Sequence, residues 1–181
     1  SNTSFIYYND SASKIGSFSV QNRQSITYDE MPQNLRDAVV SAENRTFWSD
    51  PGISVKGMSR AAFSVLRGGD VQGGSTITQQ YIKVLYLSQE RTMQRKLKEL
   101  VLADKMGRKV PKEDILAGYL NTIYFGRGAY GVQAAAKAYF NIDAKDLDLR
   151  QAAVLAAVLN NPTLFDPSDG PAARERLLGR Y

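Results

Sequence analysis

Glu43 is the carboxylate whose position in the sequence best suits acid–base chemistry. It follows Leu35 and Val39 at helical spacing, so it shares the apolar side of a predicted helix. It also falls in the last turn of that helix, where the macrodipole disfavours a negative charge. Burial and the dipole both favour the protonated form, as a general base or acid near neutral pH requires. The alternative is a glutamate at the edge of the apolar side that extends into water.

A second group of charged side chains lies on a helix predicted from Gln89 to Met106. One face, with Lys98 beside it, carries side chains at i, i+4 and i+8, namely Arg91, Arg95 and Glu99. We expect the opposite, core-facing side to consist of Met93, Leu97, Leu100 and Val101. A cationic face with one carboxylate could bind a phosphate or diphosphate, and Lys83 would add a cation if the preceding helix folds back. The alternative is a solvated face of salt bridges.

The segment from Gly73 to Gln80 combines two glycines with hydroxyl and amide side chains. Glycines that lead through Ser-Thr into a helix can direct backbone N–H groups at an anion. The segment lacks the Gly-Lys-Ser/Thr ending of a nucleotide P-loop, so by itself it is a weak phosphate site. A basic, amphipathic helix predicted over residues 54–67 could lie on an anionic membrane or pack on the core.

The composition excludes several kinds of chemistry. The chain has 181 residues, 43% of them hydrophobic and 23% charged, which is typical of a globular domain. It contains no cysteine and no histidine, so thiol chemistry, disulfides and imidazole bases are ruled out. The net charge of +5 suits an anionic partner such as nucleic acid, a phosphorylated substrate or an acidic membrane.

The elements that must position these side chains are predicted to be mostly α-helical. Alternating apolar residues in 5–22 favour a short N-terminal β-hairpin. Pro32 and Pro111 are expected to open helices, the second of them ending before Gly126 and Gly128. Further helices are predicted near Thr76, after Gly131 with Ala134, Ala135 and Ala138 packed inside, and at Asp148, where Gln151 completes a capping box. Gly107 is expected to end the helix that carries the charged face.

Five ordered motifs between about residues 28 and 168 resemble the peptidoglycan glycosyltransferase domain, glycosyltransferase family 51, of class A penicillin-binding proteins and monofunctional transglycosylases. They are Ala42-Glu43-Asn44-Arg45-Thr46-Phe47 through Gly52; Gly73-Gly74-Ser75-Thr76-Ile77-Thr78-Gln79-Gln80; Arg95-Lys96-Leu97-Lys98-Glu99; Ile115-Leu116 through Tyr139-Phe140; and Ala152-Ala153 through Pro167. The family usually has aspartate where Asn44 stands, often histidine where Asp50 stands, and commonly glutamate where Gln151 stands.

The resemblance implies a lysozyme-like fold with a globular head lobe and a smaller, membrane-facing jaw lobe near residues 50–75. It implies polymerisation of lipid II into β-1,4 glycan strands by inverting transfer, with release of polyprenyl diphosphate. Glu43 would be the general base, and Glu99 would assist at the diphosphate, directly or through a divalent cation such as Mg²⁺ or Mn²⁺; no cofactor is otherwise implied. The substrate-binding residues would be Ser75, Thr76, Gln79, Gln80, Lys83, Arg91, Arg95, Lys96, Lys98 and Asn121.

The resemblance also implies a location and a domain plan. We expect residues 1–30 to form the hairpin and linker and residues 31–181 the glycosyltransferase domain. An upstream transmembrane anchor and a possible transpeptidase domain would lie outside the chain. The site of action would be the extracytoplasmic face of the bacterial cytoplasmic membrane, with lipid II, the growing strand, the membrane surface and cell-wall synthesis proteins as partners, and no nucleic acid.

Three other hypotheses remain open on sequence alone. A lysozyme-like hydrolase would cut glycan, but hydrolysis of a neutral chain gives no reason for the cationic cluster around Lys83 and Lys96. A nucleic-acid-binding module would fit the net charge of +5 and the ten tyrosines, although no recognition motif is present. A scaffold that binds the lipid precursor without turnover would fit the Asn44 substitution.

Overall fold

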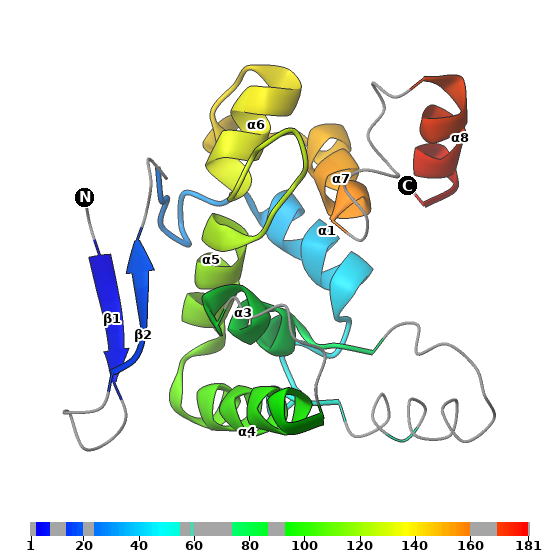
Figure 1. The fold of residues 1–181 in the computed structure, drawn as a ribbon. Helices are drawn as coiled ribbons and strands as arrows, with labels where there is room; N and C mark the ends of the chain where they lie inside the picture. The colour runs from blue at the N-terminus through cyan, green and yellow to red at the C-terminus, as the bar shows by residue number, and fades with distance from the viewer. Residues whose placement is uncertain are drawn as a thin grey trace.

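The computed structural model describes residues 3–7, 14–19, 24–54, 59, 74–86, 93–159 and 170–180. Within these ranges the chain is mostly helical, as predicted (Figure 1). Its elements are β1 (Thr3–Tyr7), β2 (Lys14–Ser19), α1 (Gln33–Glu43), α3 (Ile77–Tyr86), α4 (Met93–Lys109), α5 (Lys112–Thr122), α6 (Val132–Phe140), the short 3-10 helix η1 (Ala144–Asp146), α7 (Leu149–Val158) and α8 (Pro171–Arg180). The predicted helix over 54–67 lies almost wholly outside the described residues.

The helices form one packed body around α5. Helix α1 packs along α7, while α3 packs against both α5 and α4, so α3 lies between the central helix and α4 (Figure 1). The core joins side chains from all of these regions, including the fully buried Leu35, Phe47, Ile77, Tyr119 and Leu155. No helix in the described part of the chain is long and apolar enough to cross a bilayer.

Local sequence signals account for most helix starts. Pro32 and Pro111 stand immediately before α1 and α5, where a residue without a backbone N–H costs no hydrogen bond. The Asp148 carboxylate accepts a hydrogen bond from the backbone N–H of Gln151, and Gln151 Oε1 accepts one from the backbone N–H of Asp148, which confirms the predicted capping box at α7. Helix α5 ends at Thr122, before the predicted stop at Gly126.

The N-terminal strands β1 and β2 pair in antiparallel fashion, with Thr3 opposite Ser19. This pair overlaps residues 5–22, for which alternating apolar residues predict a hairpin, and it projects to one side of the helical body (Figure 1). The segment that connects the two strands lies outside the described residues.

Two predictions about helix α4 were wrong. The helix does not end before Gly107 but continues through it to Lys109. A Cβ atom at Gly107 would lie 2.3 Å from the Pro51 carbonyl oxygen, so this glycine permits close backbone contact and does not end the helix. The predicted core-facing residues Leu97 and Val101 are in fact 60% and 65% exposed.

The inner side of α4 is instead the row Glu99, Ala103 and Gly107, spaced by four residues. Glu99 is 6% exposed and Ala103 is fully buried. Because Ala103 and Gly107 lie directly against Gly52 in the loop after α1, the helix is rotated so that Leu97 and Val101 face outward. A similar error affects α6, where Ala135 and Ala136 are buried but the predicted packing residues Ala134 and Ala138 are exposed.

Candidate active site

Glu43 is the last residue of α1 and is half-buried, as its place on the apolar side of the helix predicts. Its Oε2 atom accepts a hydrogen bond of 3.3 Å from Nε2 of Gln80, which lies on α3. The first and second motifs therefore meet in space although 37 residues separate these side chains. A carboxylate with an amide donor beside it is a plausible acceptor for a substrate proton.

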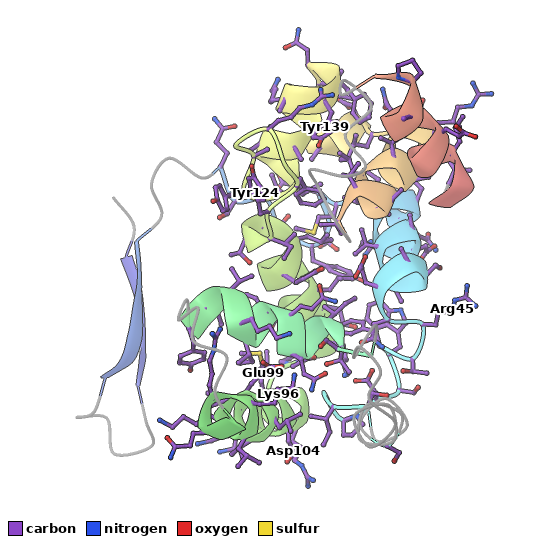
Figure 2. All side chains as sticks on the ribbon, turned by 45° about the vertical axis from the view of Figure 1, so that its right-hand side comes forward. Arg45, Lys96, Glu99, Asp104, Tyr124 and Tyr139 are labelled. Carbon is purple, nitrogen blue, oxygen red and sulfur yellow. The ribbon has the colours of Figure 1, made fainter. Side chains whose placement is uncertain are left out.

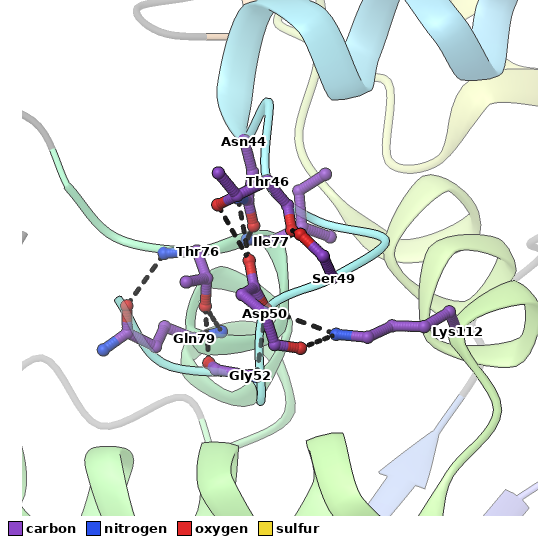
Figure 3. Close-up of polar contacts among 9 residues, drawn as sticks. All are labelled: Asn44, Thr46, Ser49, Asp50, Gly52, Thr76, Ile77, Gln79 and Lys112. Atoms are coloured by element: carbon purple, nitrogen blue, oxygen red, sulfur yellow. Dashed lines mark hydrogen bonds and ion pairs between the residues drawn. The ribbon is translucent and has the colours of Figure 1, made fainter. Parts of the chain in front are cut away.

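The loop that follows Glu43 is fixed to α3 and α5 through Asn44 and Asp50 (Figure 3). Asn44 Oδ1 accepts from the backbone N–H of Ile77 at 3.0 Å, and Asn44 Nδ2 donates to Asp50 Oδ2 at 3.0 Å. Asp50 Oδ1 in turn accepts from the Gly52 N–H at 2.9 Å and from Lys112 Nζ at 3.2 Å. The hydrogen bonding beside Glu43 is thus complete with asparagine at 44 and aspartate at 50.

Thr76 and Gln79 form a capping box that opens α3. The Gln79 backbone N–H donates to Thr76 Oγ1 at 3.0 Å, and the Thr76 N–H donates to Gln79 Oε1 at 2.8 Å (Figure 3). The Thr76 hydroxyl also donates to the Gly52 carbonyl at 2.7 Å. Both side chains are almost wholly buried, at 1% and 3% exposure, so the fold uses their polar groups. The predicted helix start near Thr76 is confirmed.

Gln80 uses both ends of its side-chain amide. While Nε2 faces Glu43, Oε1 accepts a hydrogen bond of 2.8 Å from the Tyr119 hydroxyl on α5. Burial raises the pKa of Tyr119 well above its ordinary value, and the charge of Glu43 raises it further. The phenol therefore keeps its proton and remains a donor.

Two lysines converge on Glu99 between α3 and α4, where Lys96 and Glu99 lie side by side (Figure 2). Lys96 Nζ lies 2.8 Å from Glu99 Oε1, and Lys83 Nζ lies 3.8 Å from the same oxygen. Lys83 also donates to Ser75 Oγ at 3.4 Å. The predicted approach of Lys83 to the cationic helix is confirmed, because α3 does fold back on α4.

The surroundings of Lys83 lower its pKa from the ordinary value. Burial lowers the pKa of Lys83, Glu99 opposes this effect, and the positive charges of Lys96 and Arg95 add to it. The positive charges of Lys83, Lys96 and Arg95 thus lie near one another, and the buried Glu99 carboxylate partly balances them. Such a cluster is suited to an anion with several negative oxygens.

The remaining predicted substrate residues are Arg91, Arg95, Lys98 and Asn121. Arg95 is half-buried and Lys98 is exposed, both on α4, while Arg91 lies outside the described residues. Asn121 is used by the fold, since its amide exchanges hydrogen bonds with the backbone of Ile26, at 3.0 Å to N and 2.9 Å to O. It therefore ties the segment before α1 to α5.

The surroundings of Glu99 do not fit a metal ion. Two ammonium groups lie within 4 Å of its carboxylate, and they would repel a divalent cation. Among the residues that the structure describes, no three acidic side chains gather into a metal-binding group.

A separate hollow of about 390 Å³ lies between α1 and α7. Small side chains and one arginine line it, and they are Ala38, Ser41, Ala42, Arg45, Ala153, Ala156 and Ala157. None of the predicted site residues lines this hollow. It is separate from the Gln80–Glu43 contact and from the lysines at Glu99.

Three residues at the site were missed from the sequence. Asp50 and Lys112 are 62 residues apart and form a pair whose side chains are only 7% and 17% exposed. Tyr119 stands at an apolar position in its helix, where its ring predicts core packing and gives no sign of a functional hydroxyl. A buried Tyr is expected to find a hydrogen-bond partner, but the sequence does not say which one.

Comparison with known proteins shows the family of the chain. Residues 10–179 match the family model described as Transglycosylase. The chain is 46% identical over 154 residues to penicillin-binding protein 1A of Mycobacterium tuberculosis, covering 83% of this chain and 19% of that protein. It is 45% identical over 166 residues to penicillin-binding protein 1A of Aquifex aeolicus (91% and 22%), and 40% identical over 155 residues to penicillin-binding protein 1F of Bacillus subtilis (85% and 22%).

The chain spans about a fifth of the length of these relatives. The matched part includes Glu43 and Gln80, which the fold brings into contact, and the pair Lys83 and Glu99. The chain belongs to the transglycosylase family, the peptidoglycan glycosyltransferases found in penicillin-binding proteins.

Proposed function

We propose that this domain polymerises lipid II into β-1,4 glycan strands by inverting transfer, with Glu43 as the general base. The observation that carries the proposal is the double contact made by α3. Gln80 touches Glu43, and Lys83, one turn further along the same helix, reaches the Glu99 cluster. Gln80 and Lys83, which are about 5 Å apart along the helix axis, therefore link one helix both to a base and to a site for a polyanionic leaving group.

In the proposed reaction, the 4-hydroxyl of the acceptor sugar gives its proton to a Glu43 oxygen and attacks the anomeric carbon of the donor. The bond from that carbon to the diphosphate oxygen breaks, and its electron pair leaves with polyprenyl diphosphate. Lys83, Lys96 and Arg95 would neutralise the departing charge, an effect that is often the largest single contribution to catalysis. Arg91 and Lys98 would extend this cationic surface.

Glu99 would act by holding the two lysines in place. With Lys96 at 2.8 Å and Lys83 at 3.8 Å, its carboxylate is committed to ammonium groups. It is not arranged like the protonated acid of a hydrolase, which must donate to a leaving sugar oxygen. This contact favours transfer from a diphosphate over hydrolysis of a glycan.

The Gly73–Gln80 segment would form the floor of the sugar–diphosphate cleft. We propose that Ser75, which contacts Lys83, faces the substrate. Thr76 and Gln79 would shape the floor from below, because their polar groups cap α3. Asn121 would support the site by holding the segment near Ile26.

The proposed setting is the extracytoplasmic face of the bacterial cytoplasmic membrane, where the chain would adopt a lysozyme-like head and a smaller jaw near residues 50–75. The described residues suggest one lipid-facing surface, the outward side of α4. There Leu97 and Val101 are 60% and 65% exposed, next to the exposed Lys98 and Lys105. Apolar side chains ringed by lysines suit an anionic bilayer surface.

The test is polymerisation of lipid II by the wild-type domain and by Glu43→Gln. We expect glycan strands from the wild type and a rate roughly 10²–10⁴-fold lower from Glu43→Gln, because a positioned base contributes about that much. Glu113→Gln, at an exposed position in the first turn of α5, is the matched control and should keep the wild-type rate. Normal strands from Glu43→Gln would remove Glu43 from the role of base, and cleavage of polymeric glycan without polymerisation would make the domain a hydrolase.

A further inference from the structure

Tyr119, Gln80 and Glu43 form a chain of hydrogen bonds that crosses three helices. The Tyr119 hydroxyl on α5 donates to Gln80 Oε1 at 2.8 Å, and Gln80 Nε2 on α3 donates to Glu43 Oε2 at 3.3 Å, at the end of α1. Tyr119 is fully buried and Gln80 is half-buried, so water does not easily replace the tyrosine hydroxyl. None of the three residues is a neighbour of another in sequence.

The chemistry of the groups gives this chain one direction. An ionised carboxylate only accepts hydrogen bonds, so it requires the NH₂ end of the amide. The Gln80 oxygen is then left facing α5, where a buried acceptor without a donor would be costly. Only a donor at that point satisfies it, and the Tyr119 hydroxyl is the donor present.

We propose that Tyr119 is a positioning residue that fixes the Gln80 amide so that its Nε2 group donates to the Glu43 carboxylate. Without the phenol, the amide keeps, besides its contact with Glu43, the long hydrogen bond of 3.5 Å from Nε2 to the Ser75 carbonyl, so its oxygen can more easily turn toward the carboxylate and repel it. The donated hydrogen bond stabilises ionised Glu43, which is the form that a general base needs. Tyr119 would therefore set the pH above which the base is ready, and this inference rests on the proposed role of Glu43.

The surrounding charges remain the same when this chain is broken. Among the described residues, the charged side chains on the elements around Glu43 are Arg36 and Asp37 on α1, Arg45 and Asp50 in the following loop, Lys83 on α3, Arg95, Lys96, Lys98, Glu99, Asp104, Lys105, Arg108 and Lys109 on α4, Lys112, Glu113 and Asp114 on α5, and Arg150 on α7. Burial and the charge of Glu43 keep Tyr119 protonated, so replacing it with phenylalanine removes a hydrogen bond and no charge. Any shift in the titration of Glu43 then reports the hydrogen bond.

The experiment is the pH profile of kcat/KM for lipid II polymerisation by wild type and Tyr119→Phe. We expect the midpoint of the acid limb to move up by about one pH unit, as for the loss of one donor to a carboxylate. Tyr81→Phe is the matched control, since Tyr81 directly follows Gln80 on α3 and its side chain packs against Gly118. It should leave the midpoint unchanged. Loss of folded protein would lower the profile at every pH without moving its midpoint.

A second variant tests whether Gln80 is the link. In a Gln80→Leu background the acid midpoint should already be raised, and adding Tyr119→Phe should not raise it further. Shifts that add, or a Tyr119→Phe midpoint equal to that of the wild type, would overturn the proposal. If the wild type makes no strands, the proposed function fails. The hydrogen-bond chain is then tested by ¹³C NMR titration of the Glu43 carboxyl. Tyr119→Phe should still raise the midpoint of that titration.

Discussion

At the scale of single residues, Asn44 and Asp50 show how the loop after Glu43 is held by a complementary pair of side chains. The amide of Asn44 donates to the Asp50 carboxylate at 3.0 Å, while its oxygen accepts from the Ile77 backbone. Asp50 also forms a salt bridge with Lys112, whose side chain is 17% exposed. Because Asn44 follows Glu43 directly, this pair sets where the last turn of α1 ends relative to α3.

This pairing predicts a reciprocal rescue. Asn44→Asp would place two carboxylates side by side, and Asp50→Asn would leave Lys112 without its charged partner, so each change should lower the free energy of unfolding by about 1–3 kcal/mol. The double variant restores one amide and one carboxylate in exchanged positions. In urea unfolding, the loss of unfolding free energy in the double variant should be smaller than the sum of the losses in the two single variants. The difference, which is the coupling energy, should be about 0.5–3 kcal/mol.

The same cycle should be followed in polymerisation rate. If Asn44 positions Glu43, activity should be recovered together with stability in the double variant. Strictly additive losses of stability would show that the Asn44–Asp50 hydrogen bond contributes nothing. Asp104→Asn, which breaks the exposed pair with Arg108 on α4, is a control for removal of a surface carboxylate.

At the scale of elements, the orientation of α4 depends on two glycines in contact. A Cβ at Gly107 would lie 2.3 Å from the Pro51 oxygen, and one at Gly52 would lie 2.3 Å from the Ala103 oxygen. Gly52 also has φ +94, a conformation that L side chains rarely adopt. This contact directs Glu99 toward α3, where the lysines meet it.

Gly107→Ala should therefore destabilise the domain despite the better helix propensity of alanine. Alanine in a helix is favoured over glycine by about 1 kcal/mol, but the close backbone contact should make the net loss about 1–3 kcal/mol, as in an overpacked core. Thermal or urea unfolding measures it. Gly179→Ala in α8 is the matched control, because nothing lies within 4 Å of a Cβ there. Equal effects of the two substitutions would contradict the proposed contact.

At the scale of the whole molecule, one side of α4 faces the lysine cluster and the other is open. The open side carries Leu97 and Val101, and the net charge of the chain is +5. An anionic bilayer would attract the domain through its excess charge and bury the two apolar side chains. Glu99, on the inner side of the same helix, would then lie close to the bilayer surface, where a polyprenyl diphosphate ends.

Vesicle sedimentation tests this orientation. The domain should bind phosphatidylglycerol vesicles better than phosphatidylcholine vesicles, and salt should weaken the binding. Leu97→Gln with Val101→Gln should weaken it roughly tenfold, the effect of losing about 1.4 kcal/mol of apolar burial. Leu149→Gln on α7 is the control, since Leu149 is 66% exposed but belongs to another helix. An equal loss in the control would show that the face of α4 has no special role.

Local signals in the sequence were sufficient for the helices and for several of their ends. Proline before α1 and α5, Thr76 before α3, and the Asp148–Gln151 box each act through neighbouring backbone groups, so they do not depend on the rest of the fold. The motifs also indicated the family, which the family match confirms. Their order along the chain was enough for that purpose.

The orientation of those helices was decided by tertiary contact. Periodicity assigned Leu97 and Val101 to the core, but the Gly52–Gly107 approach turned α4 and exposed them. The same applies to the site: the Asp50–Lys112 pair and the Tyr119–Gln80–Glu43 chain join residues dozens of positions apart. The sequence by itself therefore determined the residue types, the helices and the family. Which side of each helix faces inward, and which polar groups find each other, depended on packing, because hydrogen bonds and close backbone contacts act only over a few ångströms in space.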